Sequence, residues 1–563
     1  MPYRSPAAEL RFIMDQVVPL APVAATAMFA EATEDTVDAI LTEAARLCDV
    51  VMAPLNRNGD LTPARLGPDG VVASPGFRQA YQQIAEGGWV SVAGPAAYGG
   101  MGLPLTVAIA VNDMMAGANL ALQLNPLLTQ GQIEALEHHA SPELQQVYIP
   151  RLVSGEWAGT MNLTEPQAGS DVGALRAKAV PNGDGTYAVT GQKIFISWGD
   201  SDLTANVCHL VLARLPDAAP GTRGISLFMV PKFIPDAAGA PGVANAVKVV
   251  SLEHKMGLHG SPTCVMAFEG ATGWLVGAPH KGMAAMFTMM NNARLNVGVQ
   301  GIGVAEAAFQ KACEYALDRV QFSPIIDHAD VRRMLAEMKA EVFAARSIAL
   351  ACAVALDMQR ATGDAAWAAR GALLTPVAKA YGTDVGMWVA DQGIQVHGGM
   401  GFIEETGAAQ FWRDVRVTAI YEGTNGIQAM DLVGRKMMDD GKAAFRLLQE
   451  IEDEAASARN ILPDLAEDIW QASESLREHT EWLLTQENPD RFAGAVPYLR
   501  AFARVLGGHF HLRAALADRT SGARRALAAV YIRRLLPQVA ACLAEARAGA
   551  AGLYALSNEE LAS

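Results

Sequence analysis

The chain of 563 residues lacks the sequence signatures of the commonest nucleotide-binding folds. No G-x-G-x-x-G fingerprint follows a strand-like run, and no G-x-x-x-x-G-K-[ST] sequence is present. These absences exclude a Rossmann motif and a P-loop. Any dinucleotide must therefore be bound by a different route.

Cysteine is also scarce, and its spacing excludes two further classes of protein. Six cysteines are scattered along the chain with no C-x-x-C pair. This argues against a zinc site and a disulfide framework, and it fits a reducing cytosol. No cluster of His, Asp and Glu has metal-ligand spacing either, so we expect no metal. Because the cysteine pattern fits a reducing compartment, we expect a cytoplasmic location.

Basic residues and long apolar runs are limited as well. The chain has 44 Lys and Arg against 59 Asp and Glu, a net charge of −15 with no basic block, so a nucleic-acid partner is not expected. Glu9, Arg11 and Asp15 interrupt the N-terminus, which is therefore not a signal peptide. The uncharged stretch 16–30 contains two prolines and is too short to span a bilayer, so no membrane span is expected.

What is present is a large apolar fraction in a changing pattern. Hydrophobic residues make up 51% of the chain and charged residues 18%, enough for a large core and two to four domains. The pattern predicts a mainly α protein with a central β domain. The expected domains are a helical N-terminal domain at 1–156, a β domain at 157–276, a helical bundle at 277–438 and a C-terminal helical appendix at 439–563.

Within these domains, apolar periodicity and turn residues predict individual elements. Asp35 or Thr36 is expected to cap a first helix through Cys48. The turn 182–185 predicts a hairpin, and the density of strands indicates a small barrel or sandwich. The other strand candidates are Lys193–Ser197, His209–Arg214, Ile225–Pro231, Val247–Leu252 and Thr263–Glu269. The later helix candidates include 283–291, 297–319, 331–362, 368–396, 411–419, 442–459 and 523–548, of which the long ones suggest a four-helix bundle.

One carboxylate, Glu422, lies in a setting that suits chemistry. It stands between an apolar run at 417–420 and the polar turn 423–426. Apolar surroundings disfavour the ionised carboxylate and raise its pKa, which is how a protein obtains a usable general base. The alternative is a surface glutamate in a glycine-containing loop.

Several further segments are candidate ligand contacts, and each could instead have only a structural role in the fold. The loop 161–171 offers backbone N–H groups at Ala168, Gly169 and Ser170, and the strand after it places Phe195 and Ser197 on one face. Arg294, alone on an apolar helix, needs either an internal carboxylate or a ligand phosphate. Arg319-Val-Gln-Phe322 could hold a pyrophosphate or simply end a helix, and Gln395-Val-His-Gly-Gly-Met-Gly-Phe402 could approach a dinucleotide phosphate, with His397 as a loop residue or cofactor contact.

Four methionines at 283–290 are expected in the core, with an adaptable pocket wall as the alternative.

These segments, in this order, resemble the acyl-CoA dehydrogenase family. The matching text is Leu163-Thr-Glu-Pro with Gly169-Ser-Asp171, Lys193-Ile-Phe-Ile-Ser197, Arg294, Arg319 to Phe322, Gln395 to Phe402 and Ile420-Tyr-Glu-Gly-Thr424. The N-terminal Met1-Pro-Tyr-Arg-Ser-Pro and the appendix resemble the longer subgroup that includes 3-methylmercaptopropionyl-CoA dehydrogenases.

The resemblance implies FAD bound without a Rossmann fold, and it assigns roles to matching residues. It implies that Met161, Leu163, Thr164, Gly169 and Ser170 line the flavin, with Phe195 and Ser197 across from it, and that Thr424 and Asn425 close over its phosphates. Arg319, Phe322, Gln395, Gly398 and Gly399 would reach the FAD of a neighbouring subunit in a homodimer. The substrate contacts would be Ser170, Asn291, Arg294, Tyr421 and Gly423. Asn291 stands where the family often has an acidic residue, and Phe195 stands where many relatives have Trp.

The same resemblance implies the reaction. Glu422 would take the α-proton of an acyl-CoA and Cβ would pass a hydride to flavin N5, giving a trans-2-enoyl-CoA. The other family location for a base, just before Arg294, is Ala293. The acceptor is expected to be an electron-transfer flavoprotein, and the acyl group to be 3-methylmercaptopropionyl or another short or medium chain. The alternatives are an acyl-CoA oxidase that uses O₂ and a non-catalytic assembly factor of the same fold.

Overall fold

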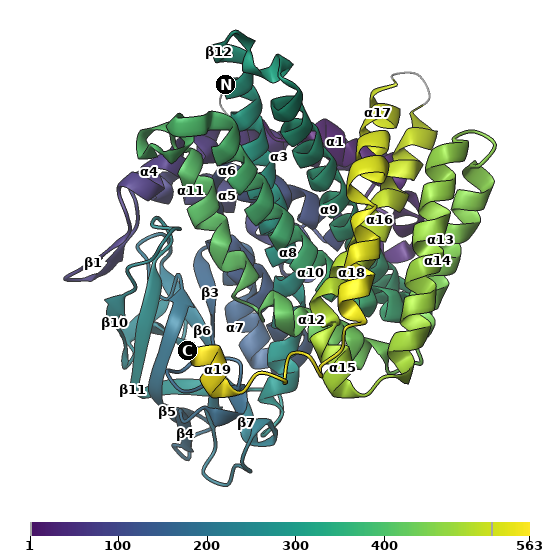
Figure 1. The fold of residues 1–563 in the computed structure, drawn as a ribbon. Coiled ribbons are helices and arrows are strands. Elements are labelled where there is room, and N and C mark those ends of the chain that lie inside the picture. The colour runs from purple at the N-terminus through teal and green to yellow at the C-terminus, as the bar shows by residue number, and fades with distance from the viewer. Residues whose placement is uncertain (1–2, 519–521) are drawn as a thin grey trace.

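The computed structural model describes residues 3–518 and 522–563, and it has the expected succession of helical, β and helical regions followed by a helical extension (Figure 1). The first helical region runs through α1 (Ala7–Phe12), α2 (Ala21–Ala24), α3 (Glu34–Leu47), α4 (Asn56–Leu61), α5 (Phe77–Glu86), α6 (Leu105–His139) and α7 (Pro142–Val153). It also holds an unpredicted hairpin of β1 (Arg65–Gly67) and β2 (Gly70–Val72).

One sequence prediction in this region needs correction. The cap of α3 is Thr33, whose hydroxyl accepts from the backbone N–H of Thr36 at 3.2 Å, and not Asp35 or Thr36. The longest helix of the region, α6, is assigned as one helix although it has non-helical backbone at Asn119 and contains Pro126. Almost all of α6 is buried, so packing outweighs the helix-breaking residues.

By length and composition alone, two stretches could cross a membrane. One is α6, where 94% of the most apolar window is buried inside the protein, and the other is Ala523–Ala546, where the share is 39%. The apolar surface of α6 is used in the interior, as expected for a core helix.

The β region is a curved sheet whose strands close into a ring. Its strands are β3 (Trp157–Asn162), β4 (Lys178–Pro181), β5 (Tyr187–Ser197), β6 (Asn206–Arg214), β7 (Ile225–Pro231), β10 (Val247–Leu252) and β11 (Thr263–Val276). The path β10-β11-β5-β4-β6-β3 is closed by β7, which pairs with both β11 and β6. The hairpin predicted at 182–185 joins the antiparallel strands β4 and β5. A separate pair, β8 (Phe233–Pro235) and β9 (Pro241–Ala244), lies outside the ring.

The second helical region holds the predicted bundle. Its long helices α8 (Gly282–Asp318), α9 (Ala329–Thr362) and α10 (Ala365–His397) lie side by side in Figure 1, and α11 (Ala408–Val415) and α12 (Asn425–Val433) pack on α10. The two helices expected at 283–291 and 297–319 are the single helix α8. The asparagines between them do not end it, because Asn296 bonds Asn112 of α6 and Asn292 bonds Glu134, so their side chains are satisfied inside the fold.

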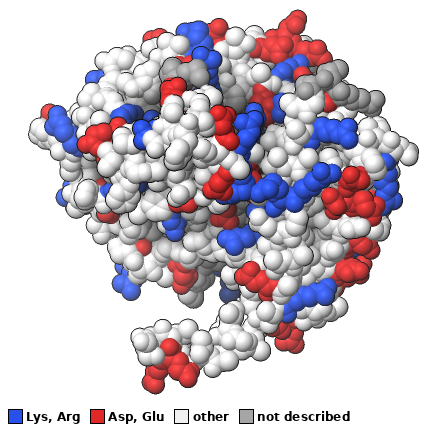
Figure 2. Space-filling model, turned by 45° about the horizontal axis from the view of Figure 1, so that its top comes forward, with Lys and Arg blue, Asp and Glu red and all other residues white. Residues whose placement is uncertain are grey.

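The C-terminal extension packs against this bundle. It comprises α13 (Lys442–Ala458), α14 (Pro463–Thr485), α15 (Asn488–Ala493), α16 (Ala495–Ala517), α17 (Ala523–Val530), α18 (Gln538–Ala546) and α19 (Asn558–Ala562), with a π-helical turn at Tyr531–Leu535 where one helix was predicted over 523–548. Helix α16 contacts α9, α10 and α12. Residues 551–563 are all exposed, and this last segment projects from the body in Figure 2.

Candidate active site

Glu422 occupies a short, conformationally constrained loop between a 3₁₀ turn and α12. Its φ is 56° and that of Gly423 is 83°, both in the left-handed region. A non-glycine residue there is uncommon and costs free energy that the surrounding structure must offset. Thr424 then caps α12, its hydroxyl accepting from the N–H of Ile427 at 3.2 Å. The loop is therefore held at its far end by a well-formed helix start.

None of the described residues is hydrogen-bonded to the carboxylate of Glu422. The residue is half-buried, and its Oε2 atom is fully buried and unpaired. Burial raises the pKa of Glu422 to about 7, although the nearby charges of Arg294 and Lys379 act in the opposite direction. A carboxylate that titrates near neutral pH can both accept and release a proton under working conditions.

Arg294 lies beside this loop without an ion-pair partner. The side chain is 8% exposed and its Nε is buried and unpaired. Within residues 3–518 and 522–563 it makes no hydrogen bond or salt bridge; Asp431 and Glu422 act on it only at longer range. A Cβ added to Gly423 would meet Arg294 Nη2 at 4.0 Å. The internal ion pair considered from the sequence is not seen, which leaves the guanidinium free for an anionic ligand.

The backbone around Glu422 presents a run of free donors. In the part of the chain that the structure describes, the N–H groups of residues 422–426 donate no hydrogen bond. Two of them precede the helix and the others stand at its N-terminus, where the helix dipole favours negative charge. Such a run suits a developing oxyanion or a phosphate.

A polar chain leads from this loop into the protein. The hydroxyl of Tyr421 donates to Gln300 of α8, and the amide of Gln300 donates to Gln123 of α6 at 2.9 Å. Asn291, the other expected substrate contact on α8, is exposed. Of the methionines at 283–290, Met286 and Met289 are fully buried, which confirms the core interpretation for those two.

The loop expected to line a flavin is fixed by a buried ion pair. Glu165 accepts from Lys193 Nζ at 2.8 Å and from the N–H groups of Arg176 and Ala177, and Lys193 also donates to the carbonyl of Leu163 at 2.9 Å. The carbonyl of Thr164 accepts from Ile194 at 2.9 Å, which ties the loop to β5. Met161, Leu163 and Thr164 are half-buried, at or just beyond the end of β3.

Downstream in this loop the accessible donors are fewer than the sequence suggested. The N–H of Ala168 bonds the carbonyl of Glu165 at 2.9 Å, so it is not available to a ligand. Gly169 and Ser170 are exposed, and a Cβ on Gly169 would meet no atom within 4 Å. Open space therefore lies beside these two residues.

Phe195 and Ser197 lie where β5 is irregular. The register with β11 shifts between Lys193 and Ile196, and Phe195 has a φ of 60°. This β-bulge turns Ile196 into the core and leaves Phe195 60% exposed with Ser197 half-buried. An exposed aromatic ring on a bulged strand suits stacking against a planar ligand.

A second group of candidates lies at the far ends of α8 and α10. Phe322 is fully exposed in a hairpin just beyond Arg319, and a Cβ on Gly398 or Gly399 would meet no atom within 4 Å. Arg319 and Gln395 stand at the ends of the same two helices. Along α8, 25 residues separate Arg294 from Arg319, and at 1.5 Å per residue this is about 37 Å. One chain therefore keeps the two groups well apart.

His397 corrects a sequence interpretation. It is neither a loop residue nor placed to contact a ligand freely. It ends α10, is 5% exposed, stacks on Tyr315 with ring centroids 4.4 Å apart, and bonds the carbonyl of Gly393 at 2.6 Å. The ring ties the end of α10 to that of α8.

Sequence reasoning missed a set of polar residues beneath the Glu422 loop. Lys379 of α10 is fully buried, and its ammonium donates to Asn425 Oδ1 at 2.9 Å. Asn425 in turn donates to Asp384 at 2.7 Å and to Thr383 at 2.9 Å. The side-chain amide of Asn425 is thus engaged inside the fold. The signal was available, since Lys379 is as isolated in an apolar helix as Arg294.

The unpaired groups fit a flavin and a thioester ligand. The buried Glu422 Oε2 and Arg294 Nε, the exposed ring of Phe195 and the free N–H groups at 422–426 are the polar, aromatic and anion-binding elements that such ligands require. No group of three or more His, Cys, Asp and Glu that could hold a metal occurs among the described residues.

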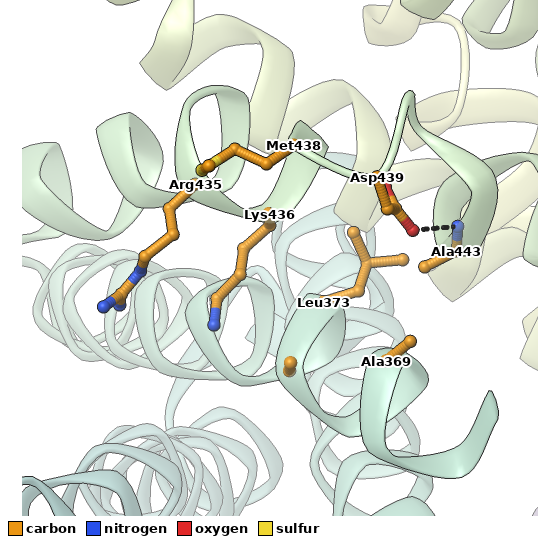
Figure 3. A pocket seen from close by; sticks show the side chains of 8 residues that line it. Ala369, Leu373, Arg435, Lys436, Met438, Asp439 and Ala443 are labelled. Carbon is orange, nitrogen blue, oxygen red and sulfur yellow. Dashed lines mark hydrogen bonds between the residues drawn. The ribbon is translucent and has the colours of Figure 1, made fainter. Parts of the chain in front are cut away.

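A cavity elsewhere must be distinguished from this site. It has a volume of about 410 Å³ and lies between the start of α10 and the segment 435–443 (Figure 3). Its lining includes Lys436, Asp439 and Leu373, but not Glu422 or Arg294. The chemistry described above therefore does not belong to this cavity.

Comparison with known proteins places the chain in one family. Family models described as acyl-CoA dehydrogenase N-terminal, middle and C-terminal domains match residues 64–156, 160–271 and 280–438. A model described as acetyl-CoA dehydrogenase C-terminal like matches residues 447–557. The chain belongs to the acyl-CoA dehydrogenase family: it is an FAD-dependent oxidoreductase that acts on acyl-CoA.

Individual relatives cover nearly the whole chain. A 3-methylmercaptopropionyl-CoA dehydrogenase of Ruegeria pomeroyi is 42% identical over 528 residues, which are 90% of each chain. The solved structure of Caenorhabditis elegans ACDH-11 in complex with C11-CoA is similar with a TM-score of 0.81 at 21% identity, over 95% of this chain and 92% of that one. An acyl-CoA dehydrogenase from Bacillus anthracis complexed with FAD has a TM-score of 0.73 at 21% identity, over 99% and 93%.

Proposed function

We propose that this enzyme forms the α,β double bond of an acyl-CoA thioester, with Glu422 as the base that removes the α-proton. The observation that carries the proposal is the unpaired, buried carboxylate oxygen of Glu422 beside two cationic side chains. Burial keeps the pKa near 7, while Arg294 and Lys379 keep a useful fraction of the carboxylate ionised.

The other residues of the loop have complementary tasks. The free N–H groups of Glu422 and Gly423 are donors for the charge that develops on the thioester oxygen. Arg294, Asn291 and Ser170 are proposed to bind the CoA part, and Tyr421 and Gly423 to line the acyl group. The buried surroundings of the carboxylate exclude water and favour proton transfer from carbon.

FAD, when bound, supplies the acceptor for the hydride that leaves Cβ. We propose that Met161, Leu163, Thr164, Gly169 and Ser170 hold its ring system, with Phe195 and Ser197 opposite. Thr424 and the free N–H groups at the start of α12 would bind its phosphates, together with Asn425 through its backbone.

The second residue group supports a homodimer. Arg319, Phe322, Gln395, Gly398 and Gly399 are about 37 Å along α8 from Arg294, and their glycines and aromatic ring are uncovered in the single chain. We propose that they reach the FAD of a second copy. Six free thiols, most of them buried, support a cytoplasmic location.

For the substrate, we propose 3-methylmercaptopropionyl-CoA or another short or medium acyl-CoA. The named activity of the Ruegeria pomeroyi relative supports this choice. A panel of acyl-CoAs, mixed anaerobically with the FAD-loaded protein, tests it by the bleaching of flavin absorbance. The proposal expects fastest bleaching with 3-methylmercaptopropionyl-CoA or another short or medium acyl-CoA, and fastest bleaching with long straight chains would overturn it.

The base is tested by Glu422→Gln. Flavin reduction by substrate should slow by about 10²–10⁴-fold, the range typical of a lost general base, while the yellow flavin stays bound. Glu405→Gln, at an exposed position, is the matched control and should react at the wild-type rate. Rapid reduction in Glu422→Gln would remove Glu422 from this role.

The acceptor is tested separately. We propose an electron-transfer flavoprotein, so turnover in air without it should be slow and form little hydrogen peroxide. Peroxide formed in an amount equal to the enoyl product would identify an oxidase instead.

A further inference from the structure

The Glu422 loop is fastened to α10 by a group of buried and half-buried polar side chains that are not assigned contacts with the reacting atoms. Asn425, three residues after Glu422, accepts from Lys379 Nζ at 2.9 Å and from Thr383 at 3.2 Å. It donates to Asp384 Oδ1 at 2.7 Å. Both ends of the amide are thus bonded to one helix, and the loop cannot move without breaking them.

The charge of Lys379 makes this arrangement demanding. A fully buried ammonium is costly unless it is paired and hydrogen-bonded. The only hydrogen bond that the ammonium of Lys379 makes within the described chain is to Asn425. The anions that face it are Glu422 on the loop and Asp384 on its own helix, and the other cation nearby is Arg294 of α8. The ammonium therefore depends on these two carboxylates and on the side-chain oxygen of Asn425.

Asp384 connects this group to the C-terminal extension. Arg500 of α16 lies with its Nε 3.6 Å from Asp384 Oδ2. Burial raises the pKa of Asp384, and Arg500, Asn425 and Lys379 oppose that shift. Helix α16 also packs against α12, the helix that begins at Asn425. The extension therefore contacts the base loop through both a charge and a packing surface.

We propose that Lys379, Asp384 and Arg500, joined through Asn425, form a positioning relay by which the C-terminal helical extension holds the Glu422 loop in its reactive geometry. The inference rests on the proposed role of Glu422 as the base. The relay residues are positioning residues: they act through the loop and are not assigned contacts with the substrate.

The charges of the relay residues determine how each substitution changes the pKa of Glu422. Replacing Asp384 by Asn removes one of two anions beside Lys379, so the pKa of Lys379, already lowered by burial to about 8, falls further. Lys379 then carries less of its charge at neutral pH, which weakens one of the two cations that act on Glu422. The pKa of Glu422 must rise. Removing Arg500 favours protonated Asp384 and acts the same way, more weakly because Arg500 is half exposed.

The experiment measures kcat and KM against pH for FAD-loaded, full-length protein with 3-methylmercaptopropionyl-CoA and an artificial electron acceptor. In Asp384→Asn the acid-side midpoint of kcat/KM should move up by roughly one pH unit, and in Arg500→Gln by roughly half a unit, within the range for loss of a nearby opposite charge. Arg500→Lys should restore the wild-type profile. KM should change less than kcat, because the substrate contacts are intact.

The matched control is Arg477→Gln. Arg477 of α14 forms an ion pair with Glu452 of α13 inside the extension, at 2.6 Å. It should leave the profile unchanged. Wild-type midpoints in both Asp384→Asn and Arg500→Gln, or an equal shift in Arg477→Gln, would overturn the relay. If Glu422→Gln is inactive while the relay variants behave as wild type, only the relay fails; if Glu422→Gln retains activity, the proposed function itself fails.

Discussion

Two glutamates of the candidate site, Glu165 and Glu422, show how differently one side chain can be used. Glu165 lies in the β region and is 4% exposed. Its carboxylate accepts hydrogen bonds from Lys193 and from two backbone N–H groups. Burial raises its pKa, but Lys193 and the backbone donors outweigh burial, so the pKa lies below its usual value. Glu422 has two cations nearby but no hydrogen bond to its buried oxygen, and its pKa rises to about 7. Glu165 has a hydrogen-bonded cation and backbone donors to offset burial, whereas Glu422 has only cations that act without a hydrogen bond, and this difference separates the structural from the reactive carboxylate.

The largest expected effect concerns the structural glutamate. Glu165→Ala leaves the fully buried Lys193 without its anion, and breaking such a pair typically costs about 3–5 kcal/mol of unfolding free energy. Chemical denaturation of the FAD-saturated protein measures this loss. The double variant Glu165→Leu with Lys193→Met should recover most of it. A stable single variant would show that the ion pair does not hold the loop.

Arg294→Met should weaken substrate binding with a smaller cost. Among the described residues the guanidinium has no ion-pair partner that the substitution would leave unpaired. The loss is therefore that of a charge-assisted contact to CoA, about 1.5–3 kcal/mol in kcat/KM. Steady-state kinetics at several substrate concentrations separates KM from kcat. Arg435→Met, at an exposed pair with Asp431, is the control and should have little effect.

Glu422→Gln should make the protein more stable at high pH. The pKa of Glu422 is raised on folding from 4.5 to about 7. The folded state therefore binds more protons between these values, and stability falls as the pH rises through that window. Above pH 7 the neutral glutamine avoids this cost, which we expect to be roughly 1–3 kcal/mol. Thermal unfolding at pH 8 and at pH 4.5 should show a difference at pH 8 alone; an equal difference at both would contradict the assignment.

The smallest predicted effect is the pH dependence of the wild-type enzyme. Because the base must be ionised, kcat/KM should rise about tenfold per pH unit below its midpoint and level off above a midpoint near pH 7. A midpoint near 4.5, the value of an ordinary glutamate, would place Glu422 in the same class as Glu165.

Most of the architecture could be predicted from the sequence, because turns and short strands are determined by local residue patterns. The hairpin around 182–185 was predicted, and the strands Ile225–Pro231 and Val247–Leu252 were predicted with the bounds that the structure has. Helix boundaries failed where long-range contacts decide, as at 292–296, where Glu134 and Asn112 of a distant helix satisfy the asparagines that seemed to end α8.

The site was predictable in part for the same reason. Glu422 and Arg294 stand out as single charged residues in apolar segments. The raised pKa expected for Glu422 agrees with its burial. The bulge at Phe195 and the engagement of Asn425 by Lys379 and Asp384 depend on partners that are distant in the sequence, so no local pattern reveals them.

The left-handed backbone at Glu422 and the immediate start of α12 fix the length of this loop. Each residue of a helix turns the chain by about 100°, so adding or deleting one residue between 422 and 425 would swing the carboxylate away from Arg294 or pull Thr424 off the helix start. Length variation should therefore be tolerated in the loops of the β region and in the projecting C-terminal segment, but not in these four positions.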